Sequence, residues 1–155
     1  MNSQSALLLL NAIDQTIHEI DGISGSNDLV DAYLAKFLVV YICGMYEEVI
    51  ETAFTDFFVR NTSRQEVVTY ARDSVAKSFM NPKFDKLMKL IGSFGNATWT
   101  SALKSMSSER IALDSIVENK NNIAHGHGAI ITLLDIKQYY INSRPLIEKF
   151  DELLV

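Results

Sequence analysis

Cysteine, glycine and proline are all scarce in this sequence, and their scarcity excludes several classes of protein. Cys43 is the only cysteine, so the chain can form neither an intrachain disulfide nor a zinc site built from several cysteines. Seven glycines and two prolines in 155 residues are too few for collagen-like, low-complexity or many-turned β architectures. A net charge of −5 with 48% apolar residues argues against disorder. The sequence therefore predicts one folded domain over residues 1–155.

Long apolar runs and targeting segments are also missing. No uninterrupted apolar run reaches about 18 residues, the length that a membrane-spanning helix needs. The first five residues carry no positive side chain, and the apolar stretch 6–10 is too short for a secretory signal. These absences predict a cytoplasmic protein with no membrane partner.

Apolar residues recur at helical spacing along almost the whole chain, which predicts an all-α, up-and-down bundle with one core. Asn27 or Asp28 is expected to cap the second helix, and Ser63, with Glu66 three residues later, is expected to open the third through a capping box. The expected helices cover about 3–20, 28–60, 63–80, 83–91, 99–106, 108–125 and 131–154.

The second of these helices is predicted to be the longest and carries no charged residue from Phe37 to Tyr46. A helix that is apolar all round is buried on most sides. It therefore either runs through the middle of the bundle or presents one face to another chain. Because a small bundle cannot cover all of this surface, the sequence predicts a homodimer.

Charge is unevenly distributed along the chain. Residues 1–59 carry one basic and nine acidic side chains, a net charge of −8, and residues 105–155 carry a net −2. Residues 60–104 carry eight basic and three acidic side chains, a net +5. A net acidic protein binds nucleic acid poorly without specificity, although a local basic stretch can guide a phosphate chain. The simpler interpretation of this stretch is a solvated helix surface.

The segment from Glu118 to Gly128 concentrates polar side chains at the end of a predicted helix. Asn121 and His125 are four residues apart and share a helix face, and Lys120 can swing toward them on its flexible stem. Gly126 and Gly128 would leave room for a ligand or a partner. A simpler alternative is a helix end, because histidine complements the dipole there and glycine is a common C-terminal cap.

The stretch 120–126, Lys-Asn-Asn-Ile-Ala-His-Gly, resembles the signature of HEPN domains, in which an arginine precedes a histidine by four to six residues. The apolar residues 116–117 before it fit the usual lead-in. Residues 41–50, with Tyr46-Glu47 in a long apolar helix, and residues 81–95 followed by Trp99 are similar to the RiboL-PSP-HEPN branch. The resemblance covers about residues 30–150.

This resemblance implies a helical bundle that pairs as a homodimer, with the signature helices of two chains meeting in a cleft. It implies a metal-independent RNA endonuclease of a toxin–antitoxin or anti-phage defence system, with an antitoxin or another defence protein as a candidate partner. In such enzymes the 2′-OH of RNA attacks the adjacent phosphorus and leaves a cyclic phosphate. No metal and no cofactor is expected.

Carried onto this chain, the resemblance assigns four catalytic residues. His125 would move the proton, and Lys120 would stabilise the charge that develops on the phosphorane. Asn121 would orient His125 or bind a phosphate oxygen, and Glu47 would be the acidic partner. The expected RNA contacts are Asn122 and His127.

Two positions depart from the family pattern. Lys120 stands where the family usually has arginine, and lysine lacks the planar fork that grips two phosphate oxygens. His127 stands where some members carry a tyrosine that a partner enzyme modifies. Two alternatives therefore stay open. One is a weak or inactive HEPN module that binds RNA, a nucleotide or a protein, and the other is a plain helical interaction domain.

Overall fold

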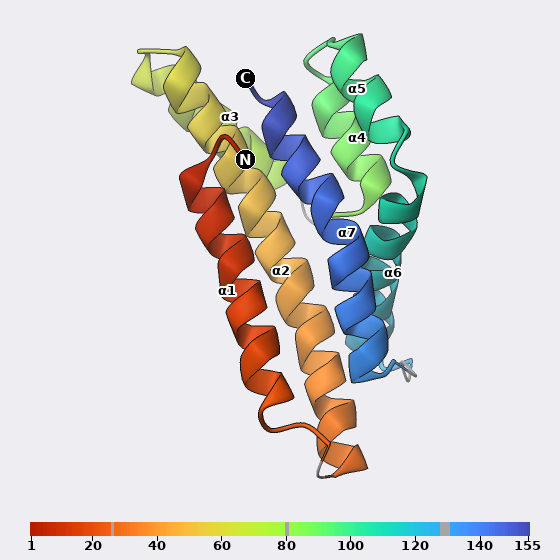
Figure 1. The fold of residues 1–155 in the computed structure, drawn as a ribbon. Helices are drawn as coiled ribbons and strands as arrows, with labels where there is room; N and C mark the ends of the chain where they lie inside the picture. Colours follow the sequence, from red (N-terminus) through yellow and green to blue (C-terminus); the bar gives the residue numbers. More distant parts are fainter. Residues whose placement is uncertain (26, 80, 128–130) are drawn as a thin grey trace.

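A computed structural model describes residues 1–155 except 26, 80 and 128–130, and this part of the chain forms seven α-helices and no strand. The long helices α1, α2, α6 and α7 lie side by side, and the shorter α3, α4 and α5 pack around one end of the bundle (Figure 1). The predicted all-α bundle is confirmed. The helices are α1 (Gln4–Asp21), α2 (Asp28–Asn61), α3 (Gln65–Ser78), α4 (Phe84–Gly92), α5 (Ala97–Lys104), α6 (Ser107–Ala124) and α7 (Leu133–Leu153).

Polar caps fix where several helices begin. The Ser3 side chain accepts a hydrogen bond from the Ala6 amide at the start of α1. Asn27 accepts from two amides of α2, which confirms one of the two predicted caps. Thr132 forms a capping box with Asp135 at the start of α7. Each cap satisfies backbone donors that the first turn of a helix leaves without partners.

The predicted capping box of Ser63 and Glu66 is wrong. Helix α3 begins at Gln65, and Arg64, its N-cap residue, makes no capping bond through its side chain. Instead, the Arg64 amide donates to the Thr62 hydroxyl at 3.2 Å. This local turn competes with the capping box, because serine and threonine side chains can bind backbone amides outside a helix.

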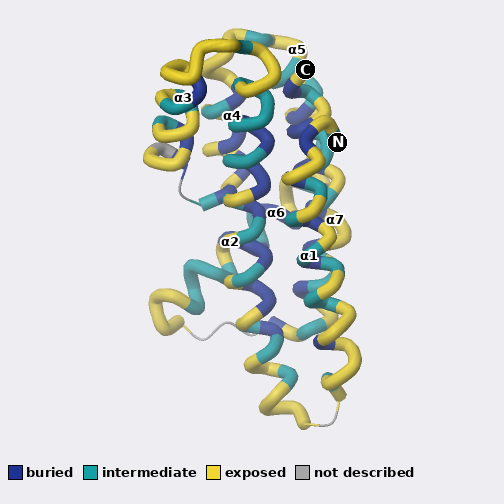
Figure 2. The backbone as a smooth tube through the Cα atoms, turned by 90° about the vertical axis from the view of Figure 1, so that its left-hand side faces the viewer, coloured by how far each residue is buried: buried dark blue, intermediate teal, exposed yellow. Residues whose placement is uncertain are grey.

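Helix α2 runs through the middle of the bundle and packs against α1, α3, α6 and α7. Its buried side chains include Tyr46 and Phe54, which are among the largest in the core and are fully buried. Phe54 packs against the rings of Phe94 and Phe150, so this aromatic side chain of α2 contributes to the core. Burial alternates with exposure along α2 (Figure 2).

By length and composition alone, α2 is long and apolar enough to cross a membrane. The core helix of a soluble protein meets the same criterion, and α2 contacts four other helices. These contacts are consistent with a soluble protein. The cytoplasmic location stays a prediction.

One side of the first half of α2 is apolar but exposed. Residues 30, 33, 37 and 40 are spaced by three or four, so they share a helix face. Tyr33 is 63% exposed, Phe37 50% and Val40 48%. Surface patches of this kind often mark interaction sites. We call this surface the α2 apolar face, and it consists of Val30, Tyr33, Phe37 and Val40.

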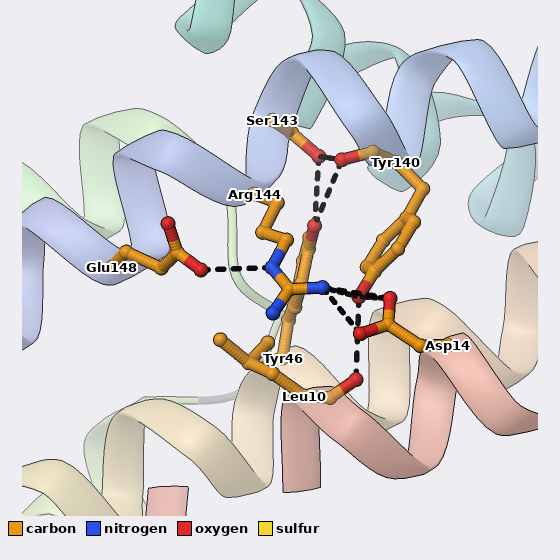
Figure 3. A network of polar contacts seen from close by, with 7 residues as sticks. All are labelled: Leu10, Asp14, Tyr46, Tyr140, Ser143, Arg144 and Glu148. Atoms are coloured by element: carbon orange, nitrogen blue, oxygen red, sulfur yellow. Dashed lines mark hydrogen bonds and ion pairs between the residues drawn. The ribbon is translucent and has the colours of Figure 1, made fainter. Parts of the chain in front are cut away.

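A polar network joins α1, α2 and α7 on another side of α2 (Figure 3). Arg144 donates to Asp14 at 2.7 Å and to Glu148 at 2.8 Å, and the Tyr140 hydroxyl donates to Asp14 at 2.8 Å. The Tyr46 hydroxyl lies 2.9 Å from that of Ser143. Because these groups satisfy one another, the network holds three helices together without leaving a buried polar atom unpaired.

The two ends of the chain are tied together at one end of the bundle (Figure 1). Asp151 is fully buried, and its carboxylate accepts hydrogen bonds from the backbone amides of Asn2 and Ser3. Arg60 donates to the Leu154 carbonyl at 2.9 Å. These bonds fix the start of α1 and the end of α7 against the end of α2.

Candidate functional site

The end of α6 forms the first part of the candidate site. The backbone amide of His125 donates to the Asn121 carbonyl at 3.0 Å, and His125 is the C-cap residue. Gly126 follows with φ +72°, a conformation that favours glycine, and its amide donates to the Ile123 carbonyl. The predicted glycine cap is thus present. A Cβ at Gly126 would meet nothing within 4 Å, so the backbone here is open. Gly128 lies outside the described residues.

The polar side chains of this segment have no binding partner among the described residues. The hydrogen bonds and ion pairs found in this part of the chain include none from the side chains of Lys120, Asn121, Asn122, His125 and His127. The two histidines are exposed, and the other three residues are half-buried. Folding therefore leaves five neighbouring polar groups available to a ligand or to a second chain.

The two histidines lie next to each other. Their ring centroids are 6.4 Å apart, with an angle of 42° between the rings. An imidazole exchanges a proton near neutral pH and can act as an acid or as a base. A pair of imidazoles at this separation can therefore reach two different oxygens of one small group.

Lys120 and Glu47 both act electrostatically on Cys43, a buried residue of α2. Burial is the main cause that raises the pKa of the Cys43 thiol to about 12, and the negative charge of Glu47 contributes to this rise. The positive charge of Lys120 acts on the same pKa in the opposite direction. A charge from α2, that of Glu47, and a charge from α6, that of Lys120, thus act on the same thiol.

Asn81 is a member of this site that the sequence did not single out. Its backbone amide donates to the Glu47 carboxylate at 2.8 Å, and its side-chain oxygen lies 3.9 Å from the Cys43 sulfur. Asn81 has φ +88°, which asparagine tolerates better than most residues. The pair Asn81-Pro82 is a turn signal that the sequence carries, but only the fold places it beside Glu47.

The predicted site residues thus fall into two groups. Glu47 on α2 and Lys120 on α6 both act electrostatically on Cys43, whereas His125 and His127 lie side by side just beyond the end of α6. Among the described residues, no hydrogen bond or ion pair joins Lys120 to His125. The part of the chain that the structure describes also contains no group of three or more potential metal ligands among His, Cys, Asp and Glu.

A sequence model of the RiboL-PSP-HEPN family matches residues 2–155, essentially the whole chain. The chain therefore belongs to this branch of the HEPN superfamily, as the signature indicated. Membership supports a nuclease-like or RNA-related module. No curated protein and no solved structure shows significant similarity to the chain.

Proposed function

We propose that this chain is a metal-independent RNA endonuclease whose active site includes Lys120, Asn121 and His125. The observation that carries the proposal is the set of uncommitted polar side chains at the end of α6, at the positions of the family signature. Polar side chains that only stabilise a fold usually have hydrogen-bond or ion-pair partners within the protein. Arg144, which donates to Asp14, is an example. Groups that must bind a phosphate need to be unpaired in the free protein.

The proposed reaction needs two proton transfers and one site of positive charge. His125 takes the proton from a ribose 2′-OH, whose oxygen then attacks the adjacent phosphorus. The bond from phosphorus to the 5′ oxygen breaks, and His127 gives that oxygen a proton. The products are a 2′,3′-cyclic phosphate and a 5′-OH. Lys120 stabilises the negative charge on the phosphorane, and Asn121 binds a phosphate oxygen or orients His125.

Glu47 and Asn122 complete the proposed site. The Glu47 carboxylate accepts a hydrogen bond from the Asn81 amide and, like Lys120, acts electrostatically on Cys43. Asn122 follows Asn121 on α6, and its amide can bind the RNA backbone. Glu47 shapes the site and does not itself contact the reacting phosphate.

We further propose that the active form is a homodimer. Val40 on the α2 apolar face and Glu47 are seven residues apart, so they share a side of α2. A second copy seated on this face would lie next to Glu47 and Lys120. Such a dimer would bring two sets of signature residues toward one RNA. A role in toxin–antitoxin or anti-phage defence, with an antitoxin or another defence protein as partner, fits an RNase of this kind.

RNA cleavage by the purified protein in EDTA tests this proposal. We expect wild type to cut a labelled single-stranded RNA and to leave cyclic phosphate ends, while an RNA with 2′-deoxy sugars stays intact. His125→Ala should lower the rate by about 100-fold or more, because it removes the proton-transfer group. His18→Ala, which alters an exposed histidine of α1, is the matched control and should cut normally. Equal cleavage by wild type and His125→Ala would refute the proposed site.

A second candidate function is a HEPN module that binds RNA, a nucleotide or a protein without cutting RNA. Lysine at position 120 favours it, because lysine cannot grip two phosphate oxygens at once as arginine does. This alternative predicts that wild type binds RNA but leaves it intact. Cleavage that appears only in Lys120→Arg would then show that the remaining geometry of the site is competent.

A further inference from the structure

A groove runs between α3 and α4, away from the signature residues. Helix α3 packs on α2, whereas α4 packs on α5 and α6, so space remains between α3 and α4. Two adjoining cavities occupy it and share Leu90 and Ser93, and the larger has a volume of about 350 Å³. Figure 2 shows α3 standing apart from α4 on the outside of the bundle. We call this feature the α3–α4 groove.

The walls of the α3–α4 groove are two apolar stripes at helical spacing. On α3, Val67, Ala71 and Val75 are four residues apart and line the groove, and Phe79 extends the same stripe. On α4, Leu90 faces them, and Phe94 follows four residues later. From residue 67 to residue 79 the groove is roughly 18 Å long at 1.5 Å per residue, which matches a helix of three to four turns.

The rim of the groove is basic. Lys86 and Lys89 line one cavity, and among the described residues that line either cavity none is acidic. The surrounding segment, residues 60–104, has a net charge of +5 in a protein whose net charge is −5. An occupant with acidic side chains on either side of an apolar stripe would therefore complement the groove in charge and in polarity.

Three exposed residues show that the groove wall is open to an occupant. Tyr70 is 76% exposed, Val67 42% and Phe94 37%. The centroid of the Phe94 ring lies 5.4 Å from that of Phe54, on which it stacks, and 5.9 Å from that of Phe58. The Phe94 ring therefore already packs against other rings of the protein. Bases of single-stranded RNA need free aromatic faces. Phe79 is buried and Phe58 half-buried, so Tyr70 has the most exposed of the aromatic rings that line the two cavities. A groove of this kind suits a helix better than RNA.

We propose that the α3–α4 groove binds an acidic amphipathic helix of a partner protein. Apolar side chains of that helix, spaced by three or four residues, would lie between Val67, Ala71 and Leu90, as in other helix-in-groove complexes. Its acidic residues would reach Lys86 and Lys89. The proposal concerns binding alone and does not depend on RNA cleavage, so His125→Ala should bind the same helix.

Helical peptides selected against the full-length protein test the proposal. The probe is a phage-displayed library of helical 14-residue peptides, followed by affinity measurement on the strongest binder and on a copy in which glutamine replaces its acidic residues. We expect binders with an apolar stripe and acidic flanks, and an affinity about 10-fold weaker for the glutamine copy. Tyr70→Asp should also weaken binding about 10-fold or more.

Reversing the charge of Lys86 and Lys89 gives a more specific test of the proposal. The double variant Lys86→Glu/Lys89→Glu should lose the acidic peptide and gain affinity for a copy with lysine at the acidic positions. Lys104→Glu on α5 and Leu8→Asp on α1 are matched controls for charge and for exposed apolar surface, and both should bind like wild type. Selected peptides without acidic residues, or binding unaffected by Tyr70→Asp, would overturn the proposal. It would also fail if Tyr70→Asp abolished RNA binding or self-association instead.

Discussion

Polar residues in this bundle differ in whether their side chains already have partners within the protein. Asp14 and Arg144 form an ion pair with each other, whereas the side chains of Lys120 and His125 form no hydrogen bond or ion pair among the described residues. The order of residues along the chain indicated the second pair, because the signature is continuous in sequence. It could not indicate the first pair, whose members are 130 residues apart and meet only through the packing of α1 on the rest of the bundle.

The raised pKa of Cys43 predicts that the protein becomes less stable at alkaline pH. This pKa is about 12 in the folded protein and near 9.0 in an unfolded chain, so the folded state holds the thiol proton more tightly. This contribution to stability is fully present below pH 9 and is lost as pH rises toward 12. Between pH 9 and 10 the free energy of unfolding should fall by about 1 kcal/mol through this group.

The measurement for Cys43 is urea unfolding at pH 7, 9 and 10, comparing wild type with Cys43→Ala. Tyr46 and Tyr140 also have pKa values raised above the ordinary 10.0, so both proteins should lose part of the tyrosine contribution as the pH approaches 10. The loss between pH 9 and 10 should still be about 1 kcal/mol smaller in the variant than in wild type, whatever the small cost of the deleted sulfur at pH 7. An identical pH dependence in both proteins would contradict the prediction.

At the scale of the element, the sequence predicted where most helices lie, because spacing and caps are local. The start of α2 followed from Asn27, whose side chain binds amides two and three residues further along the chain. The start of α3 was wrong because Thr62, another local acceptor, holds the chain in a turn before Gln65. The α3–α4 groove was not predictable, because it depends on which helices pack together and which do not.

Gly126 provides a test of the α6 end. Its φ of +72° strains any residue that has a Cβ, although the space around it is open. Gly126→Ala should therefore lower the free energy of unfolding by about 1–2 kcal/mol through the backbone alone. Thermal or urea unfolding measures this loss.

Gly92→Ala is the matched control for Gly126→Ala. Gly92 is helical and also has open space around its Cβ position, so alanine there should be neutral or stabilising. A loss of equal size in both variants would show that the α6 end is not held in the left-handed conformation.

At the scale of the whole molecule, the α2 apolar face carries the prediction of a dimer. Val40→Arg places a charge in the middle of this face without touching the core, since Val40 is 48% exposed. We expect wild type to be a dimer at micromolar concentration and the variant to be a monomer, because the buried charge would cost several kcal/mol. Analytical ultracentrifugation distinguishes the two states.

Leu8→Arg is the control for Val40→Arg, because Leu8 is an exposed apolar residue of α1. It should leave the dimer intact. RNA cleavage by Val40→Arg should fall together with dimerisation if the active site needs both copies. A wild-type protein that sediments as a monomer would contradict the prediction.

Both ends of the chain meet around the buried carboxylate of Asp151, whereas α6 ends at the opposite end of the bundle, where α7 begins (Figure 1). A fluorescent reporter or a solid support attached at either terminus would thus be separated from His125 by most of the length of the long helices. Labelled and immobilised forms of the protein should therefore retain free access to the signature residues.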